Sequence, residues 1–141
     1  MAMKSWIKIG LGAAFLLGLA GFGTGLYLLK KGHKDLLKVD PDYKITAIEL
    51  QKAFEDNETA ATEKYVNSII EVTGTVESVG TGENNATNIS LKTSNDLSLI
   101  ICTFPLEVNS LNISPGSPAT VRGECSGYLM DVLLNNCVII K

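Results

Sequence analysis

The distribution of apolar positions divides the chain into two unequal parts. Residues 9–29 form a run of 21 residues without a charged side chain, and no comparable run follows. Because a helix rises about 1.5 Å per residue, this run is long enough to cross a hydrocarbon core of roughly 30 Å. We therefore expect an uncleaved membrane anchor over residues 1–31, a polar linker over residues 32–44 and one folded domain over residues 45–141.

The apolar run has other interpretations. Lysines followed by an apolar stretch are also typical of a secretory signal peptide, although no A-x-A-type cleavage site precedes Lys30. Leu19-Ala20-Gly21 resembles the start of a lipoprotein processing box, but Phe22 occupies the position of the lipidated cysteine. Lysines flank both ends of the run, so the charge distribution does not decide the orientation. Small residues on one helical face, including Gly21 and Gly25, would permit a homodimer through the span.

In the segment that follows the linker, the spacing of the apolar residues indicates a helix. Thr46-Ala-Ile-Glu49 has the form of a capping box, in which Thr and Glu satisfy each other's backbone amides. The apolar residues that follow recur at about 3.6 positions as far as Tyr65. This pattern predicts an amphipathic helix that is interrupted near Asn57.

From Glu71 onward the period changes to two, which is typical of strands with one buried face. The pattern predicts five strands, over residues 71–79, 87–93, 97–104, 119–125 and 131–140. The longest connection joins the third strand to the fourth. This arrangement predicts a mainly β fold, a five-stranded Greek-key barrel of the oligonucleotide/oligosaccharide-binding (OB) type.

Charge narrows the possible partners of this domain. From Asp35 onward the sequence holds 15 acidic residues against 7 basic ones, a net charge of −8. A domain that binds phosphate backbones usually carries a basic face. Aromatic residues for base stacking are also scarce, since the predicted strands contain only Phe104. Nucleic acid is therefore a poor candidate for the partner.

The three cysteines all lie in predicted strands and alternate toward the core. We expect strand 131–140 to lie between strands 97–104 and 119–125, so that Cys137 can face either Cys102 or Cys125. A Cys125–Cys137 disulfide, closing the last hairpin, is the preferred pairing, and three buried thiols are the alternative. No metal or cofactor is expected, because no histidine or close cysteine spacing accompanies them.

Candidate reactive residues are few. His33 is the only histidine and lies at the edge of the apolar run, so Ser-His-Asp or Cys-His catalysis in the domain is excluded and no enzymatic activity is expected. For ligand binding, the loops and the open face of the predicted barrel offer Tyr128, Asp131, Asn84 and Asn85 as candidates.

Several spaced motifs resemble one known family. They are Phe54-x-x-Asn57-Glu58-x-x-Ala61-x-x-Lys64-Tyr65, Val72-x-Gly74-x-Val76, Cys102-x-Phe104 and Gly123-x-Cys125-x-Gly127-x3-Asp131-Val132-x-Leu134-x2-Cys137. Together they resemble the tRNA_anti-like family of small bacterial OB-fold proteins. The resemblance implies an OB fold behind an N-terminal signal or anchor, and nucleic-acid binding by analogy with anticodon-binding domains. It implies no catalytic residue.

Three functions follow as hypotheses. The first is a non-enzymatic OB-fold binding module, anchored by a single span in the cytoplasmic (inner) membrane. Its domain would project to the extracytoplasmic side, where the expected disulfide would be stable, and would bind a protein or small ligand. The second is a nucleic-acid-binding module tethered on the cytoplasmic side. The third is a redox role through Cys125 and Cys137.

Overall fold

The computed structural model describes residues 34–105 and 112–140. The predicted anchor, with Gly21 and Gly25, lies outside these residues, as does the centre of the predicted long connection. No helix within the two described ranges is long and apolar enough to cross a membrane. The elements, in chain order, are β1 (Tyr43–Thr46), α2 (Ala47–Asp56), α3 (Glu58–Tyr65), β2 (Ile69–Thr81), the 3₁₀ turn η1 (Glu83–Asn85), β3 (Thr87–Leu91), β4 (Ile100–Phe104), β5 (Pro118–Leu129) and β6 (Asp131–Ile140).

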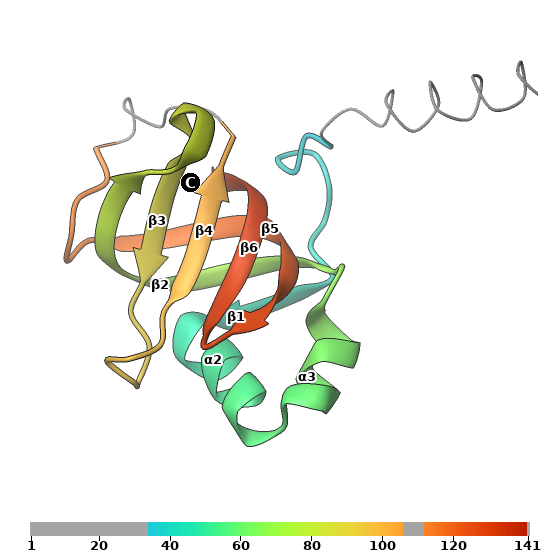
Figure 1. Cartoon of the computed structure of the whole chain (residues 1–141). Helices are drawn as coiled ribbons and strands as arrows, with labels where there is room; N and C mark the ends of the chain where they lie inside the picture. The colour runs from blue at the N-terminus through green and yellow to red at the C-terminus, as the bar shows by residue number, and fades with distance from the viewer. Residues whose placement is uncertain (1–33, 106–111, 141) are drawn as a thin grey trace, which may run out of the picture. The chain divides into compact units, whose positions relative to one another are not determined.

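Five of the strands form the predicted closed barrel (Figure 1). They follow the order β2-β3-β4-β6-β5, and antiparallel pairing of β5 with β2 closes the barrel. The last strand, β6, lies between β4 and β5, as the sequence predicts, and its pairing with β4 is parallel. This is the strand order expected of an OB fold. The alternate residues of each strand point inward and form one core, in which Ile70, Val72, Ile89 and Leu134 are essentially inaccessible.

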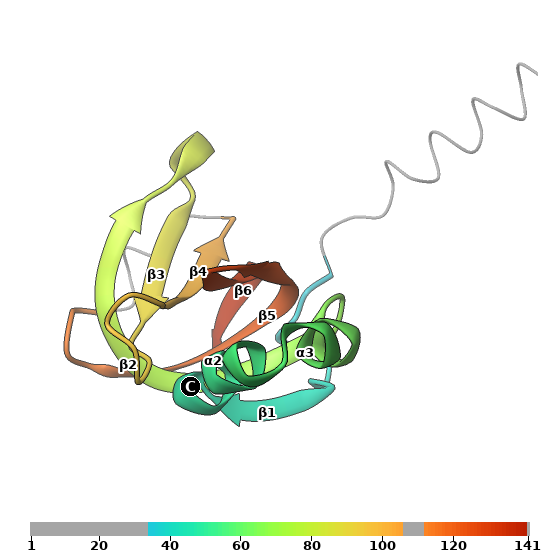
Figure 2. The same ribbon diagram turned by 60° about the horizontal axis from the view of Figure 1, so that its bottom comes forward.

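The two helices cover one end of the barrel (Figure 2). The predicted capping box is present, because the Glu49 amide donates to the Thr46 hydroxyl and the Thr46 amide donates to the Glu49 carboxylate. The predicted interruption is also confirmed. Asn57 ends α2 and caps α3, since its side-chain oxygen accepts from the Ala60 amide at 3.1 Å. Leu50 and Phe54 of α2 point into the core.

The predicted linker is the main departure from expectation. Residues 43–46 form β1, a sixth strand that pairs in parallel with residues 70–73 of β2. Ahead of it, Leu36 is fully buried. The Arg122 guanidinium donates to the carbonyls of Leu36 and Val39, at 2.9 and 2.7 Å. Residues 35–46 are therefore part of the folded domain and not a free tether, because side chains remote in sequence hold them against the barrel.

Candidate functional site

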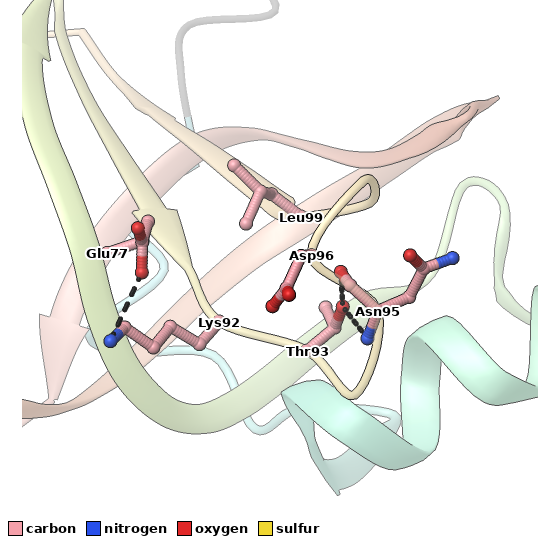
Figure 3. A pocket seen from close by; sticks show the side chains of 6 residues that line it. All are labelled: Glu77, Lys92, Thr93, Asn95, Asp96 and Leu99. Carbon is pink, nitrogen blue, oxygen red and sulfur yellow. Dashed lines mark hydrogen bonds and ion pairs between the residues drawn. The ribbon is translucent and has the colours of Figure 1, made fainter.

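A pocket of about 280 Å³ opens beside the loop that joins β3 to β4. Figure 3 shows its lining, which comes from β2, from the loop and from the residues next to β4. The lining residues are Glu77, Lys92, Thr93, Asn95, Asp96 and Leu99. A polar wall of two carboxylates, one ammonium, one hydroxyl and one amide thus faces a single aliphatic side chain. Such a pocket suits recognition of a polar group on a partner.

The loop that forms the pocket is internally braced. Asn95 is its central residue: its amide donates to the Thr93 hydroxyl at 3.2 Å, and its side-chain oxygen accepts from the Leu97 amide at 3.0 Å. Its side-chain nitrogen also donates to Glu55 of α2 at 2.9 Å. This last hydrogen bond ties the loop to the helix layer. The pocket is therefore preformed.

The pocket lining holds more acidic than basic side chains. The Lys92 ammonium lies 3.3 Å from the Glu77 carboxylate, and both side chains are about half exposed. A solvated pair of this kind contributes little stability. The exposed Asp96 carboxylate points toward the space between Lys92 and Leu99 (Figure 3) and pairs with no side chain of the described residues. The pocket therefore presents one carboxylate without a counter-ion in the described part of the chain.

Asp131, one of the predicted binding residues, supports this loop. At the start of β6, its carboxylate accepts from the Leu99 amide at 2.8 Å, and the Val132 amide donates to the Leu99 carbonyl at 3.0 Å. The Ser98 hydroxyl also donates to the Met130 carbonyl. The turn between β5 and β6 is thus fastened to the loop between β3 and β4, and Asp131 has a positioning role there.

The other predicted binding residues lie elsewhere. Tyr128 lies within β5 and not in an exposed turn as expected. Its half-buried ring stacks on Phe54, with 5.2 Å between the ring centroids. Asn84 and Asn85 are exposed in η1, with φ values of 53° and 60°. Figure 1 places η1 at the end of the barrel opposite α2. The four residues therefore form no single site, although Tyr128 and Asp131 both lie at the helix-covered end.

OB folds commonly bind oligonucleotides on the face of their second and third barrel strands, which are β3 and β4 here, and β6 continues this outer face. Here its central row is aliphatic or neutral, since Ser90 pairs with Ile101 and Ile101 with Leu133. All five aromatic residues of the described ranges are buried or half-buried: Tyr43, Phe54, Tyr65, Phe104 and Tyr128. The described part of this face therefore offers no ring on which a base could stack.

The cysteines do not form the disulfide that sequence analysis prefers. All three are free and buried, so the expected Cys125–Cys137 disulfide is not supported. Cys137 interacts with Cys102 instead, and it lies at a bulge in β6 where the register shifts after Asn135. A hydrogen bond with Cys137, together with burial, raises the pKa of the Cys102 thiol well above its ordinary value. Burial likewise raises the pKa of the Cys125 thiol. These are properties of core thiols, not of reactive ones.

Within the described ranges, no group of three or more His, Cys, Asp and Glu side chains could hold a metal ion. The pocket residues Glu77, Lys92, Thr93, Asn95 and Leu99 are not singled out by any sequence pattern. Glu77 comes from β2 and the others from the loop between β3 and β4, and only the hairpin register brings them together.

Comparison with known proteins supports this description of the fold. No curated protein matches the chain. One similar solved structure is that of a "putative nucleic acid-binding lipoprotein" from Klebsiella pneumoniae subsp. pneumoniae MGH 78578. It shares 16% sequence identity and a TM-score of 0.52, over 79% of this chain and 100% of that one. At this identity the likeness shows the fold alone. The tRNA_anti-like family model matches residues 2–139, and the chain therefore belongs to the tRNA_anti-like family.

Proposed function

We propose that this protein is a membrane-anchored, non-enzymatic OB-fold module of the bacterial envelope that binds a protein or small ligand. The anchor rests on the uncharged run over residues 9–29. Envelope association is supported by the lipoprotein description of the structural neighbour. The binding site is the end of the barrel where the loop between β3 and β4 meets the turn between β5 and β6, since the pocket lies there.

The observation that carries this proposal is the character of the usual OB binding face. Its central row is aliphatic or neutral in a domain of net charge −8, and every described aromatic ring lies in the core of the domain or packs against it. A phosphate backbone needs cations, and unpaired bases need exposed rings. The pocket instead offers two carboxylates, an amide, a hydroxyl and one ammonium, that of Lys92, which is paired with Glu77. This lining suits an uncharged or cationic ligand.

The non-enzymatic part of the proposal rests on the available chemistry. The only histidine, His33, precedes the folded domain. The thiols of Cys102 and Cys125 have raised pKa values and lie in the core. The described lining of the pocket thus contains neither a histidine base nor a thiol nucleophile.

A second candidate function is nucleic-acid binding, which the description of the Klebsiella protein favours. One titration separates the two. A fluorescent single-stranded oligonucleotide would be titrated with the full chain in neutral phosphatidylcholine nanodiscs at 50 and 200 mM salt. We expect no saturable binding below about 100 μM, the weak end of non-specific affinity. Binding that weakens steeply with salt would refute the proposal and support the nucleic-acid module.

Membrane attachment needs its own test. Membranes containing the full chain would be extracted with alkaline carbonate, beside a variant that lacks residues 1–31. We expect the full chain to stay in the membrane pellet and the shortened variant to be soluble. A full chain released by carbonate would contradict the anchor.

A further inference from the structure

Three exposed aliphatic residues lie on the two segments that hydrogen bonds join next to the pocket-forming loop. Leu97 is 79% exposed in the loop between β3 and β4, Leu129 is 79% exposed at the end of β5, and Met130 is 70% exposed in the turn between β5 and β6. We call these three residues the loop surface. Single exposed aliphatic residues are ordinary. Three on two adjoining loops, next to a pocket, indicate an interaction site.

The loop surface is held in place by hydrogen bonds between its two loops. Ser98, which follows Leu97, donates its hydroxyl to the Met130 carbonyl. Leu99 donates its amide to Asp131, which follows Met130. The aliphatic side chains therefore project from a braced base, and a partner would not have to order these loops when it binds.

The surroundings of the loop surface are acidic. Asp96 precedes Leu97, Asp131 follows Met130, and Glu55 holds Asn95 from the helix side. The one nearby cation of the pocket lining, Lys92, is paired with Glu77. An anionic lipid surface, a nucleic acid or a second copy of this acidic domain would each be repelled. A cationic partner would be attracted.

We propose that the loop surface and the pocket together bind a protein segment in which aliphatic side chains adjoin a lysine or arginine. The aliphatic side chains would cover Leu97, Leu129 and Met130. The basic side chain would enter the pocket and pair with the Asp96 carboxylate. A volume of about 280 Å³ is near the lower limit of small-molecule sites and suits one inserted side chain better than a whole cofactor. This inference rests on the proposed function and specifies the class of its ligand.

Peptide titration tests this inference. Three fluorescent twelve-residue peptides would be used: one combining leucines with a central lysine, one with that lysine replaced by glutamate, and one with the leucines replaced by serine. The full chain would be held in phosphatidylcholine nanodiscs, so that lipid charge does not attract the peptides. We expect saturable binding of the leucine–lysine peptide at micromolar to sub-millimolar concentration, and at least fivefold weaker binding of the other two.

Variants of the chain assign the contacts. Asp96→Asn should weaken binding about two- to fivefold, the range of an exposed ion pair. Lys92→Gln should strengthen it, because a competing cation is removed. Leu129→Ser with Met130→Asn should weaken it at least tenfold, and asparagine tolerates the φ of 66° at residue 130. Val79→Ser, at a 42% exposed position of β2, is the matched control and should change nothing.

Several results would overturn the inference. They are equal binding of the lysine and glutamate peptides, unchanged affinity in Asp96→Asn, or no binding up to 1 mM, roughly the weak limit for a specific contact. Vesicle binding or self-association that disappears with Leu129→Ser and Met130→Asn would instead assign the loop surface to lipid or to a second copy. Failure of the proposed function itself appears separately, as salt-sensitive oligonucleotide binding.

Discussion

Replacement of Arg122 by methionine is expected to destabilise the domain far more than deletion of an exposed charge such as that of Lys92. Arg122 of β5 lies opposite Glu71 of β2 in the pairing that closes the barrel. Its Nη2 and Nε atoms donate to one Glu71 carboxylate oxygen, at 2.7 and 3.2 Å, while Nη1 donates to the carbonyls of Leu36 and Val39. The side chains of Arg122 and Glu71 are only 12% and 13% exposed.

The magnitude follows from this burial. Removing one partner of a buried ion pair costs about 3–5 kcal/mol, because the remaining charge loses both water and its counter-ion. Loss of the hydrogen bonds to the two carbonyls adds about 0.5–1.5 kcal/mol each. The residual exposure of both side chains reduces the electrostatic part. We therefore expect Arg122→Met to lower the free energy of unfolding by about 3 kcal/mol, a large share of the total for a domain of this size.

Urea unfolding of the full chain in neutral detergent micelles, followed by near-ultraviolet circular dichroism of the tyrosines, would measure this change. Glu71→Leu and the double variant complete a mutant cycle, in which we expect a coupling energy above about 1.5 kcal/mol. Lys92→Met removes the half-exposed ion pair with Glu77 and serves as the control, with an expected loss below about 0.5 kcal/mol. A loss for Arg122→Met as small as that of the control would refute the argument.

Three further predictions concern the core, the thiols and the helix cap. Gly123→Ala should cost about 1–3 kcal/mol, because its Cβ would lie 2.5 Å from the Cys137 Sγ, and Cys137→Ala in the same chain should recover part of this loss; strictly additive urea data would contradict that. Native protein at pH 8 should resist alkylation, whereas denatured protein should take up three labels. Because the pKa values of Cys102 and Cys125 are raised by folding, unfolded thiols ionise first, and stability should fall as pH rises above about 9; a flat urea profile from pH 8 to 10 would exclude this. Thr46→Ala should cost about 1 kcal/mol by removing the cap of α2, while Thr46→Ser should retain most of that stability in thermal unfolding.

Local chemistry is the part of the fold that sequence predicts well. The capping box at Thr46 and the helix interruption at Asn57 depend on side chains that bond to amides three residues away. The alternation of apolar and polar residues along β5 and β6 is also a local pattern, and its inward residues form part of the core as expected. Each of these features needs only its own neighbours, so a pattern along the chain contains the information.

The features missed by sequence analysis depend on residues far apart in the chain. β1 is four residues long and becomes a strand only because β2 lies beside it. The backbone at Leu36 is held by a hydrogen bond from Arg122, which lies 86 residues later in the chain. The pocket likewise needs Glu77 and Lys92 to meet across the hairpin of β2 and β3. For the cysteines, alternation predicts that all three face the core, but which neighbour Cys137 meets depends on packing around the bulge in β6.

The strand order determines when the barrel can form. β6 is the last strand of the chain, yet it lies between β4 and β5, and the closing pair joins residues 69–75 to residues 118–124. During synthesis, the core of the barrel stays open until the residues of β6 are available. Until then β2, β3, β4 and β5 can pair with one another, but the inner edges of β4 and β5 have no partner strand, which favours slow folding and exposes these edges to aggregation or to chaperones. A stop codon that removes even the final ten residues would leave no partly functional barrel, since it would remove a central strand instead of an edge.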